Sequence, residues 1–138
     1  MPELSWTGIE AFTAAVDQRG QALLAAARVA VAEAAALLEK TAKQNASGRP
    51  GPNVVTGTLR RSIRTAPIEP WGIRGWQTNV SPTVVYGRRV ELGFRGADSL
   101  GRHYNQPGYP YMGPAIRSTK SAIRAIYIAH MRSAVGGL

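Results

Sequence analysis

Apolar residues recur at a seven-residue interval through the first third of the chain. The repeated positions are Ile9, Val16, Leu23, Ala30 and Leu37, with small residues on the adjoining row. This spacing places one apolar stripe along one side of a helix. It predicts a long N-terminal helix within residues 1–46. Thr7 and Glu10 have the spacing of a capping box, so helical structure is expected to begin near Gly8.

The repeat stops where helix-breaking residues begin. Residues 47–55 contain two prolines and two glycines and are expected to form a linker. An unbroken helix from Gly8 to Gln44 would be about 55 Å long, and part of it should project from so small a domain. Two interpretations stay open: an amphipathic core helix, with or without a break at Gly20, and a helix whose small-residue face packs against a neighbouring subunit.

Residues 56–138 have the mixed pattern of an α+β body. Thr56 is placed to cap a short helix that ends at Ser62, with Leu59 and Ile63 directed to the core. Strands are expected at 65–70, 71–80 and 84–90 in a small antiparallel sheet, with turns at Trp71–Trp76 and Ser81–Pro82. Pro67 cannot donate to a ladder and should place the first strand at an edge.

The remainder of the body divides into a loop and a helix. Residues 94–108 lack periodicity and are rich in turn formers, so they predict a long exposed loop. Residues 113–134 have three-and-four spacing, with Pro114 in the first turn, and predict a C-terminal helix. The expected fold is one α+β domain with a long N-terminal helix, a small mostly antiparallel β-sheet and a C-terminal helix.

Charged residues are distributed unevenly along the chain. The 138 residues carry a net charge of +9. Residues 1–39 hold two basic and five acidic side chains, a net charge of −3, whereas residues 40–138 hold fifteen basic and three acidic, a net charge of +12. An acidic helix joined to a basic body can attract copies of itself or face a polyanion. Either arrangement implies a partner.

The composition narrows the class of protein. The chain has no cysteine, which excludes disulfides, zinc fingers and a thiol nucleophile and suits a reducing cytoplasm. Alanine supplies much of the apolar content, so we expect thin helix packing. Arg28, Glu33 and Glu39 interrupt the apolar helix, and neither a membrane span nor a signal peptide is expected.

No catalytic, cofactor or metal site is expected. His103 and His130 lack the ligand spacing of a metal site, and Ser99 lacks a nucleophile elbow. Glu69 and Glu91 show no sign of forming a catalytic carboxylate pair. The chain is therefore not expected to be an enzyme. Non-specific DNA binding is the main alternative function, because arginines interleave with aromatic residues in a chain of pI about 10.9.

Three short motifs occur in a fixed order. They are T-G-x-L-R-x-S-I, a tyrosine leading to V-E-x-G, and aromatic-x-x-P-A at the start of the last helix. The residues are Thr56, Gly57, Leu59, Arg60, Ser62 and Ile63; Tyr86, Val90, Glu91 and Gly93; and Tyr111, Pro114 and Ala115. Over about residues 50–130 this order resembles the small tail-completion or neck proteins of long-tailed phages, the gp10-like minor tail family. Phe94 and Tyr111 depart from the threonine and phenylalanine often found there.

The resemblance implies a structural virion protein, assembled in the bacterial cytoplasm. Its subunits would form a ring at the head–tail junction that joins the tail to the head connector and surrounds the DNA path. The implied partners are further copies of the chain, the connector or stopper, and the tail terminator or tail tube, with non-specific contact to genomic DNA. A tail-terminator ring or another neck component is the alternative within this class.

The resemblance also implies which residues make contacts. The implied subunit or partner contacts are Thr56, Gly57, Leu59, Arg60, Tyr86, Glu91, Gly93, Tyr111, Met112 and Pro114. The candidates for a DNA-channel lining or for intersubunit salt bridges are Arg61, Arg64, Arg88, Arg89, Arg95 and Arg102.

Overall fold

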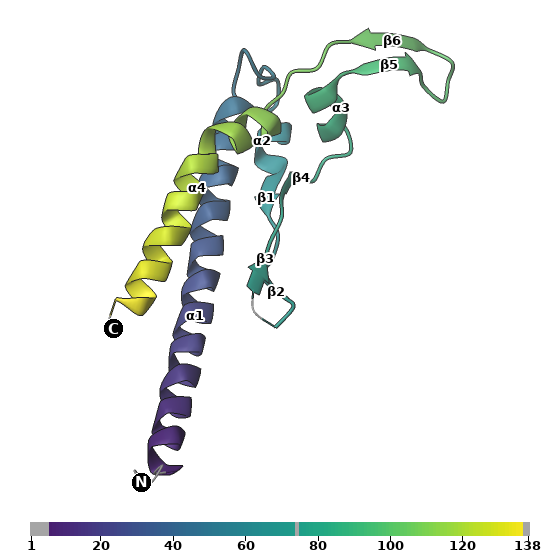
Figure 1. Ribbon diagram of the computed structural model, residues 1–138. Coiled ribbons are helices and arrows are strands. Elements are labelled where there is room, and N and C mark those ends of the chain that lie inside the picture. Colours follow the sequence, from purple (N-terminus) through teal and green to yellow (C-terminus); the bar gives the residue numbers. More distant parts are fainter. Residues whose placement is uncertain (1–5, 74, 137–138) are drawn as a thin grey trace.

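The computed structural model describes residues 6–73 and 75–136 (Figure 1). In chain order the elements are α1 (Trp6–Asn45), α2 (Thr58–Ser62), β1 (Ile63–Thr65), β2 (Glu69–Trp71), β3 (Gly75–Gln77), β4 (Val80–Pro82), α3 (Gly87–Leu92), β5 (Phe94–Ala97), β6 (His103–Gln106) and α4 (Met112–Val135). The α+β class is confirmed: a long N-terminal helix and a C-terminal helix accompany short antiparallel strand pairs.

Helix α1 runs without a break through Gly20 and ends at Asn45, as the end of the repeat predicts. Trp6 is already helical, so α1 begins about two residues before the predicted start near Gly8. The Thr7 side chain of the predicted capping box lies outside the described part of the structure. With 40 residues, α1 is about 60 Å long. Residues 8–22 are all exposed, and this part of α1 extends past the other elements (Figure 1).

Helix α4 runs antiparallel to the second half of α1 (Figure 1). Small side chains permit the close approach: the buried residues of the two helices include Ala30, Ala35, Ala42, Ala46 and Ala115. The larger buried side chains, Ile63 and Tyr111, lie at the end where α4 begins. The core is therefore thin and concentrated at one end of the helix pair.

One long, interrupted hairpin lies along α1. β1 pairs with β4 and β2 pairs with β3, both antiparallel, around a turn in which Gly72 has a φ of 62°. Pro67 lies between β1 and β2, where the ladder is interrupted. The indole Nε1 of Trp76 donates to the Leu24 carbonyl at 2.9 Å and fixes the hairpin tip to α1.

Several local predictions are wrong. Residues 84–90 do not form a strand, because Gly87–Leu92 is the helix α3. Ser81 and Pro82 belong to β4 and do not form a turn. Gly57, with a φ of 76°, is the N-cap of α2 in place of Thr56.

The C-terminal half gives one correction and one confirmation. Residues 94–108 were expected to be a loop, but they contain the antiparallel hairpin β5–β6, with Phe94 paired with Gln106. This hairpin extends away from the helices (Figure 1). Helix α4 confirms the predicted span 113–134 to within one residue at each end.

Helix α1 also has the length and apolar character of a membrane-crossing helix. The most apolar 18-residue window in Gly8–Asn45 has a mean hydropathy of 1.6 and at most two charged side chains. Length and hydropathy alone do not contradict the expectation that the chain has no membrane span. Core helices of soluble proteins and signal sequences pass the same test, so the window alone is weak evidence for a membrane.

Candidate assembly surfaces

The three sequence motifs meet at one end of the α1–α4 pair. Ile63 ends the first motif and Tyr111 lies in the third, and both are 0 % exposed. They pack in one cluster with Ala42 and Ala46 of α1, and Val90 from the second motif packs against this cluster. The motifs thus build a joint inside the subunit.

Glu91 caps the N-terminus of α4. Its Oε2 accepts hydrogen bonds from the backbone N–H groups of Tyr111 and Met112, at 2.8 and 2.9 Å, and its Oε1 accepts from Gly113 N–H at 2.9 Å. These donors have no partner within the helix, and a carboxylate at this position also interacts favourably with the helix dipole. Glu91 therefore fastens α3 to the start of α4.

Tyr111 connects the same elements through buried contacts. Its hydroxyl donates to the Gly87 carbonyl at 2.8 Å, and its own carbonyl accepts from Asn45 Nδ2 at 3.2 Å. Burial, reinforced by the negative charge of Glu91, raises the pKa of the Tyr111 hydroxyl to about 12. The phenol is thus held in its neutral, hydrogen-bonding form.

Two glycines permit a close backbone crossing after α3. A Cβ on Gly93 would lie 2.5 Å from the Gln106 carbonyl oxygen. A Cβ on Gly108 would lie 2.7 Å from the backbone carbonyl oxygen of Glu91. Gly93 also has a φ of 77°, which disfavours other residues. Tyr109 N–H donates to the Val90 carbonyl at 2.7 Å across this crossing. The crossing holds the base of the β5–β6 hairpin against α3.

The residues implied as subunit contacts therefore divide into two groups. Gly57 and Tyr111 are buried inside the subunit, and Glu91 and Gly93 are engaged there, so the structure gives these four an intramolecular role that the sequence did not indicate. Leu59, Met112 and Pro114 are half-buried. Thr56, Arg60 and Tyr86 are exposed. Among these ten residues, Thr56, Arg60 and Tyr86 are therefore the most accessible to a partner.

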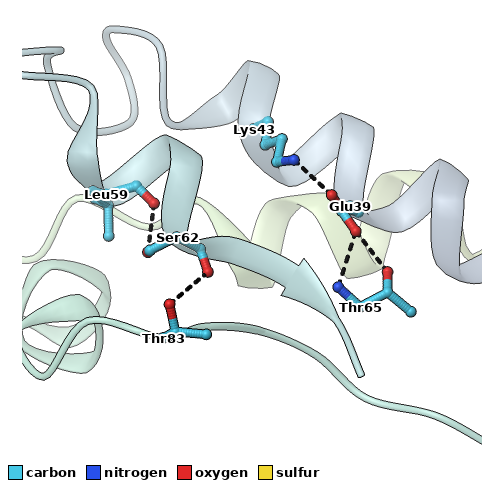
Figure 2. A network of polar contacts seen from close by, with 6 residues as sticks. All are labelled: Glu39, Lys43, Leu59, Ser62, Thr65 and Thr83. Atoms are coloured by element: carbon cyan, nitrogen blue, oxygen red, sulfur yellow. Dashed lines mark hydrogen bonds and ion pairs between the residues drawn. The ribbon is translucent and has the colours of Figure 1, made fainter. Parts of the chain in front are cut away.

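A second polar joint attaches β1 to the middle of α1. Figure 2 shows Glu39 of α1 accepting from both the backbone N–H and the hydroxyl of Thr65, at 2.9 and 2.6 Å. Lys43 Nζ lies 2.5 Å from the other carboxylate oxygen. The Lys43 hydrogen bond, followed by that of the Thr65 hydroxyl, lowers the pKa of Glu39 below its ordinary value of 4.5. Nearby, the Thr83 hydroxyl donates to the Ser62 carbonyl and ties the residue after β4 to the end of α2 (Figure 2).

The Glu39 joint predicts a specific loss of stability in acid. Because the pKa is lower in the folded state, the charged carboxylate stabilises the fold above about pH 4.5, and this contribution is lost as the pH falls through the folded pKa. In urea titrations near pH 7, Glu39→Gln should lower the free energy of unfolding by less than about 1 kcal/mol, since the pair is partly exposed. The difference between the variant and the parent should shrink steadily as the pH falls below 4.5; a difference that stays constant through the acid range would contradict the assignment.

The β5–β6 hairpin has its own local bonds. Asp98 at its turn accepts from the N–H groups of Leu100 and Arg102, and its Oδ2 lies 2.6 Å from Arg102 Nε. The Arg102 N–H, followed by its guanidinium, lowers the pKa of Asp98. At the base, the Arg89 guanidinium lies 3.8 Å from the centre of the Phe94 ring. The hairpin is therefore an ordered projection.

A groove with a basic rim lies between α1 and the α2–β1 segment. Its volume is about 830 Å³, and it is lined by Lys40, Lys43, Arg60 and Arg61 together with alanines of α1 and Ile68. Lys40 and Lys43 were not among the candidate basic residues, because a helix repeat does not show which charges face a neighbouring strand. Of the six candidates only Arg61 lines this groove.

The other basic candidates are distributed over separate elements. Arg64 is on β1, Arg88 and Arg89 are on α3, and Arg95 and Arg102 are on or next to the β5–β6 hairpin; all are exposed. Arg89 stacks on an aromatic ring, and Arg102 pairs with Asp98. Within one subunit these residues do not form a single lining.

Residues 6–73 and 75–136 contain no group of three or more side chains suited to hold a metal ion. His103 is exposed on β6, and His130 Nε2 lies 2.5 Å from Glu33 Oε2, which links α4 to α1. Glu69 and Glu91 lie on β2 and α3.

One comparison with known proteins gives a match. A family model described as "Bacteriophage HK97-gp10, putative tail-component" matches residues 10–93, which is more than half of the chain. The matched region runs from α1 to the end of α3 and includes the first two motifs. No curated protein and no solved structure matches the chain.

Proposed function

Because the chain belongs to the HK97-gp10-like family of phage tail components, we propose that it is a ring-forming protein of the head–tail junction. In this role it joins the tail to the head connector and leaves a central path for DNA. The subunit is a structural part of the virion, and its partners are copies of itself and the neighbouring neck and tail proteins.

The observation that carries the proposal is the arrangement of a fixed joint with two projections. Glu91 and Tyr111 lock α3, α1 and α4 together. From this joint the β5–β6 hairpin extends on one side and the uncovered end of α1 extends on the other (Figure 1). A ring needs one surface to meet a different surface of the next subunit, and two unlike projections suit such a contact.

The basic charge supports a position around DNA. Residues 40–138 carry a net charge of +12, and exposed arginines lie on several elements. In a ring, side chains that are scattered on one subunit repeat around the axis and lower the electrostatic cost of enclosing phosphates. The tail-terminator ring and other neck positions share these requirements.

Electron microscopy of phage particles tests the proposal. We expect this chain as a closed ring between the head connector and the tail tube, and we expect a phage that lacks it to accumulate unjoined heads and tails. Density at the tail tip or along the tube, or normal joining without the chain, would overturn the proposal.

Non-specific DNA binding is the competing function, and it is favoured by the same net charge. It predicts that the purified monomer is retained on DNA in a strongly salt-dependent manner. Retention of this kind, in a protein absent from mature particles, would favour it over the structural role.

A further inference from the structure

We propose that the projecting end of α1 docks into the basic-rimmed groove between α1 and α2–β1 of the next subunit. The inference rests on the proposed ring, for which it supplies the contact between copies. Among residues 6–73 and 75–136, no element covers the groove or the projecting helix end.

The projecting end of α1 has an apolar stripe with an acidic flank. Ile9, Phe12 and Val16 are 45, 71 and 50 % exposed. At about 100° per residue they lie on one side of the helix, and Glu10 and Asp17 lie together along one edge of this stripe. An exposed row of large apolar side chains on a rigid helix is a feature of interaction surfaces.

This stripe continues an interface that already exists in the subunit. Further along α1 the same seven-residue row includes Ala30, which is buried in the packing with α4. Two elements lie along α1, the β2–β3 hairpin and α4. The hairpin reaches as far as the bond from the Trp76 indole to the Leu24 carbonyl, and α4 ends at Val135. The row from Ile9 to Val16 therefore has the character of a covered helix face but lies beyond both covering elements.

The groove complements this stripe in shape and charge. Ala32 and Ala36 of α1 and Ile68 opposite them give it apolar walls, and Lys40, Arg60 and Arg61 line its rim. Lys43 and Glu39 neutralise each other. Among residues 6–73 and 75–136, the ion pairs leave Lys40, Arg60 and Arg61 without a carboxylate partner. Glu10 and Asp17 of a docked helix would supply one.

The occupant must come from another copy. Thr13 and Ala36 lie on the same unbroken helix, 23 positions apart, which places them about 35 Å from each other. Pairing two projecting ends with each other would join like acidic flanks and close a dimer. Insertion of the stripe into the groove of the next copy joins unlike surfaces, as a closed ring requires.

Disulfide cross-linking tests the contact directly, because the chain has no cysteine of its own. The full chain with Thr13→Cys and Ala36→Cys keeps the large apolar residues of the stripe. A disulfide needs Cα atoms within about 7 Å, so any bond between these two positions must join different copies. On oxidation, in purified protein at high concentration and in particles, we expect a ladder of covalent oligomers on a denaturing gel.

Matched variants show whether the stripe and the rim make the contact. Ala11→Cys with Ala36→Cys places the thiol about 160° away from Thr13 on α1 and should give no ladder. Phe12→Ser added to the Thr13 and Ala36 pair should abolish the ladder without affecting the fold, since Phe12 is exposed. Lys40→Glu should reduce cross-linking about fivefold, and Asp17→Lys in the same chain should restore it.

The outcomes separate this inference from the proposed function. An absent ladder, or one that is equally strong with Ala11→Cys, would overturn the inference, and a ring seen at the junction would then still support the function. A specific ladder in a protein absent from the junction would support the contact and overturn the function. DNA retention that is lost with Lys40→Glu, without cross-linking, would show that the groove binds phosphates and that the inference is wrong.

Discussion

Replacing Tyr111 with alanine is expected to lower the free energy of unfolding by about 3–5 kcal/mol, the usual cost of removing a buried aromatic side chain. Tyr111 is one of the two largest fully buried residues, and its backbone and side chain bond to α1 and α3. Small domains have total stabilities of about 5–15 kcal/mol. Urea unfolding followed by circular dichroism should therefore show a variant that is close to unfolding in water.

Tyr111→Phe separates the packing of the ring from its hydroxyl bond. It should cost about 1–3 kcal/mol, because the buried Gly87 carbonyl loses its donor. The folded-state pKa of about 12 lies above the ordinary value of 10, so the neutral phenol stabilises the fold below about pH 10 and this contribution is lost as the pH rises toward 12. The phenylalanine variant should lack this alkaline loss. Equal stability of parent and alanine variant would show that the cluster is not the core.

Replacing Glu91 with alanine is the second large effect expected, at about 2–4 kcal/mol. The substitution removes the acceptor of three backbone N–H groups and the negative charge at the start of α4. One helix cap contributes about 0.5–2 kcal/mol, and hydrogen bonds to charged groups contribute about 1.5–3 kcal/mol. Thermal unfolding should occur at a lower temperature, with loss of helix signal.

Glu91→Gln is the matched control for Glu91→Ala. The amide keeps the length of the side chain and one carbonyl acceptor but removes the charge, so its effect should lie between those of the parent and the alanine variant. Glu69→Ala removes a glutamate from exposed β2 and should change stability by less than about 0.5 kcal/mol. An alanine variant at Glu91 that unfolds at the parent temperature would mean that the capping bonds do not stabilise the fold.

The two long helices could be predicted from the sequence because their signal is local and repeated. Five apolar residues at seven-residue spacing specify α1, and three-and-four spacing after Pro114 specifies α4. The β5–β6 hairpin was missed because its strands have four residues each and are bounded by glycines that also favour loops. Residues 84–90 were assigned to a strand because valine and tyrosine favour strands, whereas the structure places part of them in α3.

The joint between the motifs could not be predicted because it depends on contacts between distant segments. A charged residue such as Glu91 is usually solvated, and nothing in its neighbourhood shows that it caps a helix 20 residues later. One signal was available in α4 itself: no acidic residue lies in its first turn, and Tyr111 at the N-cap makes no side-chain capping bond. A helix start without a capping residue of its own leaves N–H donors that need another acceptor, from water or from elsewhere in the chain.

The β5–β6 hairpin pairs only with itself among the strands, and its turn is held by Asp98 within its own sequence. The hairpin contacts the rest of the subunit mainly through the close backbone crossing at Gly93 and Gly108 and through the contact between Arg89 and the Phe94 ring. We therefore expect the rest of the subunit to tolerate a hairpin of another length or charge in this place, provided that Gly93 and Gly108 are kept.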